Sequence, residues 1–211
     1  MNPRPKRLKV LRWIPDALVS TSVRSGGPRL YLTFDDGPHP EHTLPLLDLL
    51  AEFQAKATFY LIGNQAERYP ELVRRIAEAG HRLGNHSYTH PAFEQLPLSA
   101  QLDEIERTDA LLKVADGRDL HPFRTPRGVL PPRLLWHFLR HRRSISYWTY
   151  DSMDYSRRPA AELVQSMLRH PVRAGDIVLM HDDSRISLDM LQILLPQWKA
   201  QGLEMAVLPG A

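Results

Sequence analysis

The alternation of short apolar segments with longer segments of helical periodicity, from Leu30 onward, constrains the fold of this chain more than any other feature. The expected strands are residues 29–34, 57–62, 81–84, 121–124, 145–150, 176–180 and 203–208. The expected helices are residues 43–55, 67–79, 99–114, 132–142, 160–170 and 187–201. Repeated strand–helix units favour a parallel sheet, so we expect an α/β fold whose strands form a barrel or a wound sheet.

The first 28 residues have a different character, rich in proline and in basic side chains. Residues 1–12 hold five basic residues and no acidic one, whereas acidic residues outnumber basic ones in the rest of the chain. We therefore predict a basic arm over residues 1–28 and one folded domain over residues 29–211. Such an arm suits contact with an anionic membrane surface.

Several classes of site are excluded by what the sequence lacks. The chain has no cysteine, so disulfides, thiolate metal sites and cysteine nucleophiles are ruled out. No apolar run is long enough to span a membrane, and Arg12, Pro15 and Asp16 interrupt any signal-peptide core. We expect a cytoplasmic location or one at the membrane periphery. The sequence shows no phosphate-binding loop or recognition-helix pattern, so nucleic acid is not an expected partner.

Chemically distinctive side chains follow the expected strands at their C-terminal ends. In a parallel fold these ends share one face, where loops build active sites. The residues concerned are Asp35, Asp36, His86, His90, Arg124, Asp154 and His181.

Three of these residues have the composition of a metal site. His86 and His90 are four residues apart, so one helical turn would place both imidazoles on the same side. Asp36 completes a set of two histidines and one carboxylate, which leaves positions open for water and substrate. Zinc is the expected divalent ion, and cobalt, nickel and manganese suit the same ligands. The alternatives are a solvated Asp-Gly turn and two surface histidines.

The remaining four residues suggest proton transfer. Asp35 can accept a proton from water, and Arg124 would hold Asp35 ionised by lowering its pKa. Asp154 would orient and charge His181, which could then act as a general acid. The alternatives are a surface salt bridge for Arg124 and a core position for His181.

Five short motifs, in order along the chain, carry a resemblance to a known family. They are Thr33-Phe34-Asp35-Asp36-Gly37, His86-Ser87-Tyr88-Thr89-His90, Arg124-Thr125-Pro126, Asp151 to Tyr155, and Leu179-Met180-His181. From about Leu30 to Asp183 the chain resembles the polysaccharide deacetylase, or NodB-homology, family of carbohydrate esterases (family 4).

The resemblance implies an irregular (β/α) barrel with about seven parallel strands and a catalytic domain over residues 29–211. It implies Asp35 as the general base, oriented by Arg124, and His181 as the general acid, tuned by Asp154. It also implies a divalent metal on Asp36, His86 and His90. Leu179 would line the slot for the acetyl methyl group. The expected reaction removes acetyl groups from an N-acetylated sugar in a glycan. The alternatives are hydrolysis of another C–N bond, in a carrier-linked sugar or a cyclic amide, and a catalytically inactive glycan-binding protein.

Two substrate-binding positions depart from the family pattern. Arg127 replaces the usual tyrosine after the proline, although the family uses only the backbone N–H of that residue for the oxyanion. Tyr155 replaces the usual tryptophan and is smaller, with a polar tip. We expect both changes to affect the choice of substrate, and an arginine at the rim can bind a carboxylate or phosphate.

Overall fold

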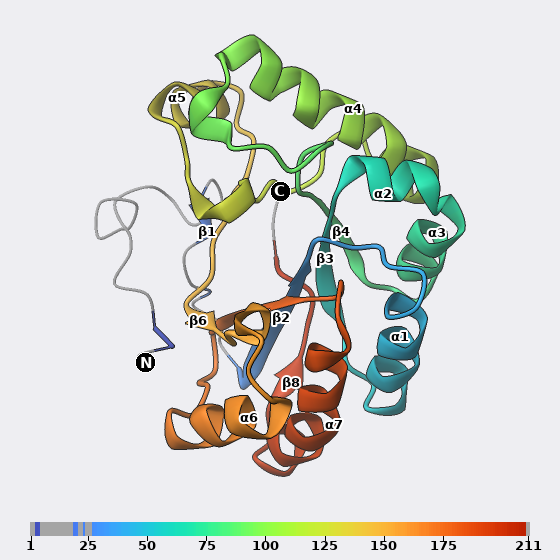
Figure 1. Ribbon diagram of the computed structural model, residues 1–211, viewed down its shortest axis with the longest axis vertical. Helices are drawn as coiled ribbons and strands as arrows, with labels where there is room; N and C mark the ends of the chain where they lie inside the picture. Colours follow the sequence, from blue (N-terminus) through green and yellow to red (C-terminus); the bar gives the residue numbers. More distant parts are fainter. Residues whose placement is uncertain (1–2, 5–18, 21–22, 24–26, 210–211) are drawn as a thin grey trace.

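A parallel sheet forms the centre of the computed structural model, which describes residues 3–4, 19–20, 23 and 27–209. Its strands lie in the order β4–β3–β2–β7–β6, and β8 pairs with the start of β2. A second, two-stranded sheet joins β1 to β5 (Figure 1). The strands are β1 (Val19–Ser20), β2 (Arg29–Asp35), β3 (Ala57–Leu61), β4 (Arg82–Asn85), β5 (Ile145–Ser146), β6 (Tyr150–Asp151), β7 (Ile177–His181) and β8 (Glu204–Met205).

Helices lie outside the strands at the top, right and bottom of the view in Figure 1. They are α1 (Thr43–Glu52), α2 (Gly63–Arg68), α3 (Pro70–Glu78), α4 (Leu98–Asp116), α5 (Pro132–Arg140), α6 (Ala160–Arg169) and α7 (Arg185–Ala200). The central strands are buried along nearly their whole length: every residue of β3 is buried, and only the first residue of β2 is exposed. This explains why these strands are continuous apolar runs in the sequence.

The sequence prediction of an α/β fold with parallel strands is confirmed. Isolated bridges at Phe123 continue the order from Asn85 of β4 to Ile145 of β5. Within the described residues no strand ladder joins β5 to β6, so the ring of strands is open at that point. The short connection between these two strands crosses this gap.

Some predicted boundaries were wrong, for local reasons. Residues 67–79 form no single helix, because α2 ends before Tyr69 and Pro70 begins α3; a residue before proline is disfavoured in the helical conformation. The predicted strand 121–124 is reduced to bridges at Phe123, since Pro122 has no N–H to donate. The predicted strand 145–150 divides into β5 and β6, and strand 203–208 shortens to β8.

Parts of the predicted arm contact the folded domain. The β1 strand pairs with β5, the Pro3 carbonyl accepts the Asp151 N–H at 2.8 Å, and Arg4 lies 2.7 Å from Asp176. The other residues of the arm lie outside the described residues, and membrane contact by the arm stays a prediction. In the part of the chain that the structure describes, every helix is too short or too polar to cross a bilayer.

Candidate active site

The C-terminal ends of the strands surround a cleft of about 440 Å³, which we call the central cleft. All three predicted metal ligands line it, together with the predicted base and acid, Asp35 and His181. The predicted substrate-binding residues Arg127, Tyr155 and Leu179 line it as well. Residues from five separate segments of the sequence thus meet at one site.

Asp36, His86 and His90 form the metal-ligand cluster that the sequence predicts. The Nε2 atoms of His86 and His90 each lie 3.5 Å from Oδ1 of Asp36. One ligand atom from each of the three residues lies within 4.8 Å of the others. Two imidazole nitrogens and a carboxylate oxygen therefore point at one small volume.

A loop, and not the predicted helical turn, brings the two histidines together. Ser87 and His90 both have left-handed backbone conformations, with φ of 68° and 55°. Local hydrogen bonds support this shape: Asn85 Oδ1 accepts the Ser87 N–H at 2.9 Å, and Ser87 Oγ accepts the His90 N–H at 3.1 Å. Pro91 disfavours a helical conformation at His90, which explains the failure of the helical-turn prediction.

The donor atoms of this cluster fit a divalent ion. Oδ1 of Asp36 is buried and has no hydrogen-bond partner among the described residues, which is costly unless a cation binds there. Nδ1 of His86 lies 2.8 Å from the Arg124 carbonyl, so it carries the proton and leaves the Nε2 lone pair free. Burial lowers the pKa of His86 to about 3, which keeps the imidazole neutral as a ligand must be.

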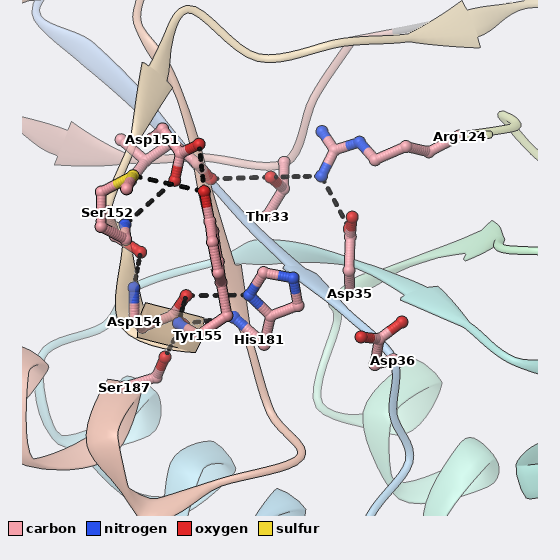
Figure 2. Close-up of polar contacts among 12 residues, drawn as sticks. Thr33, Asp35, Asp36, Arg124, Asp151, Ser152, Asp154, Tyr155, His181 and Ser187 are labelled. Atoms are coloured by element: carbon pink, nitrogen blue, oxygen red, sulfur yellow. Dashed lines mark hydrogen bonds and ion pairs between the residues drawn. The ribbon is translucent and has the colours of Figure 1, made fainter. Parts of the chain in front are cut away.

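Arg124 and Asp35 form a fully buried ion pair beside the cluster. Nη1 of Arg124 lies 2.7 Å from Asp35 Oδ1 and also donates to Thr33 Oγ1 at 2.8 Å (Figure 2). The guanidinium stacks on the ring of Tyr60, 4.1 Å from its centroid. Arg124 is therefore held in place by Thr33 and Tyr60 and fixes the Asp35 carboxylate.

The expected lowering of the Asp35 pKa was wrong. Burial raises the pKa of Asp35 above its usual range, and the charge of Arg124 only partly opposes this effect. The opposite charge of Arg124 favours a lowered pKa, but the Asp35 carboxylate is only 4% exposed and has lost the solvent that would stabilise its charged form.

His181 faces the other side of the cleft and is bound to Asp154. Nδ1 of His181 lies 2.8 Å from Asp154 Oδ1, and the His181 N–H donates to Oδ2 at 2.7 Å (Figure 2). Ser187, near the start of α7, donates a short hydrogen bond to the same Oδ2. Asp154 is thus fixed from two directions and presents the His181 ring to the cleft.

The protonation state of His181 follows from these contacts. Burial lowers its pKa, but the hydrogen bond to Asp154 and the charges of Asp154 and Asp35 outweigh burial and raise it to about 10. The pKa of Asp154 is lowered, because bonds from His181 and Ser187 outweigh its burial. His181 is therefore a cation at neutral pH.

The three predicted substrate-binding residues occupy different parts of the central cleft. Leu179 is buried in β7, two residues before His181. Tyr155 is 54% exposed, and its ring stands edge-on to the His181 ring with centroids 5.5 Å apart. Arg127 is exposed on the turn Pro126–Gly128 and has a left-handed backbone, with φ of 56°.

Sequence reasoning missed several residues that support the site. Thr33 lies two positions before Asp35, so strand alternation could have placed both side chains on one face. No sequence signal distinguishes Tyr60 or Ser187 from other core residues.

A second cleft of about 420 Å³ continues from the first, and we call it the side cleft. Both clefts are lined by Asp36 and His90. His39, Arg68, Tyr69 and Asp183 lie in the side cleft, and the sequence analysis assigned no role to them.

A buried polar network supports the histidine loop from behind. Asp109 of α4 accepts from Asn85 Nδ2 at 2.8 Å and pairs with Arg143 at 2.6 Å and His121 at 3.1 Å. Because Asn85 also binds the Ser87 N–H, the network connects α4 to the loop between His86 and His90.

Comparison with known proteins settles the family. The sequence profile of the polysaccharide deacetylase family matches residues 22–142. The chain belongs to this family. It is a hydrolase of carbon–nitrogen bonds other than peptide bonds, as are the deacetylases that it resembles.

Two curated relatives of this polysaccharide deacetylase illustrate the similarity. A peptidoglycan-N-acetylglucosamine deacetylase of Bacillus cereus is 33% identical over 203 residues, which are 94% of this chain and 73% of the relative. A chitooligosaccharide deacetylase of Sinorhizobium fredii is 34% identical over 180 residues, 84% of this chain and 80% of the relative.

The fold agrees with solved structures of the family. The crystal structure of the peptidoglycan N-acetylglucosamine deacetylase Bc1960 superposes with a TM-score of 0.87 at 30% identity, covering 94% of each chain. The described arrangement of strands and helices is therefore that of a family 4 deacetylase.

Proposed function

We propose that this deacetylase uses a divalent metal ion to remove acetyl groups from an N-acetylated sugar in a glycan. One observation carries the proposal. The Asp36–His86–His90 cluster lies in the same cleft as a carboxylate fixed by Arg124 and an imidazole fixed by Asp154. Such a cleft combines metal ligands, a base and an acid, as hydrolysis of an amide requires.

Asp36, His86 and His90 would hold the ion, and zinc is our proposal for its identity. When bound, a divalent ion of this kind supplies Lewis acidity toward a carbonyl oxygen and lowers the pKa of water. Three protein ligands leave coordination positions open, which is the pattern of catalytic and not structural sites.

Asp35 would act as the general base. Its Oδ1 is bound by Arg124, while Oδ2 lies 3.7 Å from Nε2 of the ligand His86 and so faces the cluster. Asp35 would take a proton from the attacking water, and the oxygen would add to the acetamide carbonyl carbon. The raised pKa of Asp35 makes it a stronger base than an exposed aspartate.

His181 would act as the general acid. It carries two protons at neutral pH, and its Nδ1–H is bound by Asp154, so Nε2–H is the proton available to the substrate. Donation of this proton to the sugar nitrogen breaks the C–N bond and releases acetate and a free amine. The imidazolium is restored when the proton on Asp35 returns to it through solvent.

Arg127 and Leu179 would bind the acetyl group. We assign the oxyanion to the backbone N–H of Arg127, since it lies on a turn that lines the cleft. The buried side chain of Leu179 gives an apolar contact for the acetyl methyl group.

The test is release of acetate from chitooligosaccharides and peptidoglycan fragments, with and without a chelator. We expect the wild type to release acetate. Acetate release should be lost when chelator is added to the wild type, and it should also be lost in Asp35→Asn. The control is Asp48→Asn, which neutralises an exposed aspartate of α1 outside both clefts. Acetate release that survives chelator and Asp35→Asn would disprove the mechanism.

Mass spectrometry of the products also separates the other candidate reactions. Formate or a ring-opened product would indicate hydrolysis of a different C–N bond. A protein that binds these glycans and releases nothing, even with metal supplied, would be the inactive binding protein.

A further inference from the structure

The central cleft and the side cleft meet at the metal-ligand cluster, and we call the two together the groove. Asp36 and His90 line both clefts, so the side cleft adjoins the central cleft at these two ligands, while His86 and His181 line the central cleft alone. If one sugar of a glycan presents its acetyl group to the cluster, one neighbouring sugar can extend into the side cleft and the other toward Arg127 in the central cleft. The side chains of the two clefts therefore select the flanking sugars.

The central cleft contains a cationic side chain that has no acidic partner among the described residues. Arg127 is exposed, and in the described part of the chain no carboxylate lies within ion-pair distance of its guanidinium. Two carboxylates of the same cleft already have partners, Asp35 with Arg124 and Asp151 with the Tyr155 hydroxyl at 3.1 Å. The charge of Arg127 is thus left for a ligand.

The side cleft contains a second cation of the same kind. Arg68 is exposed near the end of α2, and its guanidinium lies over the ring of Tyr69, 5.3 Å from the centroid. The described residues offer it no ion pair. Stacking on a ring leaves the N–H edges of a guanidinium free to bind a planar anion.

We propose that the groove binds a glycan with a carboxylate-bearing sugar on each side of the acetylated sugar, and that Arg127 and Arg68 each bind one carboxylate. This inference rests on the proposed function, because it places the acetylated sugar at the metal-ligand cluster. Arg127 and Arg68 thereby determine specificity for acidic over neutral glycans.

Acidic residues of the groove favour carboxylates over phosphates as the anions. Asp151 lies in the central cleft and Asp183 in the side cleft. Their repulsion is smaller toward a singly charged carboxylate than toward a doubly charged phosphate. The planar fork of arginine also matches the two oxygens of a carboxylate.

The test compares two forms of one N-acetylated oligosaccharide. In the first the flanking sugars bear carboxylates, and in the second these have been reduced to primary alcohols. We expect the kcat/KM of the wild type to be about tenfold or more higher for the acidic form than for the reduced form. Charge-assisted hydrogen bonds from the two arginines to the carboxylates provide a gain of this size. Added salt should reduce the preference, because the arginines are exposed.

Variants of the two arginines assign the preference to them. Arg127→Gln and Arg68→Gln should each lower the acidic-to-neutral ratio of kcat/KM several-fold, mainly through KM, and the double variant should bring it near unity. Arg127→Lys should restore part of the ratio. The matched control is Arg169→Gln, which removes an exposed arginine of α6 that lines neither cleft and should keep the wild-type ratio.

The outcomes separate this inference from the proposed function. Equal kcat/KM of the wild type for the acidic and reduced forms would overturn the inference and leave deacetylation intact. A wild-type preference that persists in the double variant would also overturn it. No acetate from either form, in enzyme with metal supplied, would overturn the proposed function itself.

Discussion

His181 and Asp154 are joined by two hydrogen bonds: the imidazole Nδ1 lies 2.8 Å from one carboxylate oxygen, and the His181 backbone N–H donates to the other at 2.7 Å. The first bond places a negative charge against the imidazole, and the second fixes the carboxylate to the same strand end. Together they set both the charge and the direction of the ring.

The Asp154→Asn variant should move the alkaline limb of the kcat/KM–pH profile to lower pH. In the wild type the pKa of His181 is raised to about 10, so the acid keeps its proton through neutral pH and loses it as pH rises through that value. Without the Asp154 charge the proton is lost earlier, and the maximal rate should fall about a hundredfold or more. An unchanged alkaline limb would contradict the assignment of His181 as the acid.

The same pair predicts how stability depends on pH. Because the folded-state pKa of His181 is above the ordinary 6.5, the pair stabilises the fold fully below about pH 6.5, down to the acid range in which Asp154 takes up a proton. This contribution should decline as pH rises and be lost once pH passes about 10. Urea unfolding of the wild type and of Asp154→Asn across this pH range measures the contribution. The difference in unfolding free energy between the two proteins should shrink toward high pH.

Arg124→Met should destabilise the fold by about 3–5 kcal/mol, because it leaves the Asp35 carboxylate buried without its partner. Adding Asp35→Asn should recover part of this loss, since the second change removes the unpaired charge. The measurement is urea unfolding at pH 7, with the exposed Arg133→Met of α5 as control. Strictly additive losses in the double variant would argue that the ion pair is unimportant.

His90→Ala should abolish stoichiometric zinc binding, measured by isothermal titration calorimetry and metal analysis. The wild type should gain about 2.7 kcal/mol of unfolding free energy when free zinc is a hundred times its Kd, and the variant should gain little. His141→Ala, which removes an exposed histidine beyond the end of α5, is the control. Equal zinc stabilisation of wild type and His90→Ala would contradict the ligand assignment.

Asp109→Ala should weaken zinc binding although Asp109 lies outside the cleft. The change removes the acceptor that holds Asn85, and Asn85 supports the loop between His86 and His90. It also leaves Arg143 without its 2.6 Å partner, so we expect a loss of stability of about 3 kcal/mol. Asp103→Ala, on the exposed face of α4, controls for loss of charge. If Asp109→Ala is less stable but binds zinc with unaltered affinity, the polar network around Asp109 supports the fold and not zinc binding.

The sequence predicted which residues form the site better than it predicted how they are arranged. The ends of buried parallel strands must share one face, so Asp35, Asp36 and His181 could be grouped without coordinates. The shape of the loop that carries His86 and His90 could not be predicted, because it depends on two left-handed residues and on Asn85 and Ser87 as acceptors.

Burial was the other quantity that the sequence left undetermined. The opposite charge of Arg124 suggested a lowered pKa for Asp35, and the depth of the pair reversed the sign. Similarly, the apolar run 145–150 looked like one strand, whereas its residues belong to two sheets on either side of an opening. Both errors concern how distant segments enclose a residue, which a linear pattern does not encode.

Pro3 and Arg4 connect the beginning of the chain to the edge of the central cleft. The Pro3 carbonyl accepts the N–H of Asp151, whose side chain lines the cleft, and Arg4 binds Asp176 just before β7. A chain that started after Arg4 would lose both contacts and free the backbone of Asp151. A change at Pro3 or Arg4 is therefore a change at the edge of the central cleft, and variants altered at these residues should not be compared with the wild type as though their clefts were identical.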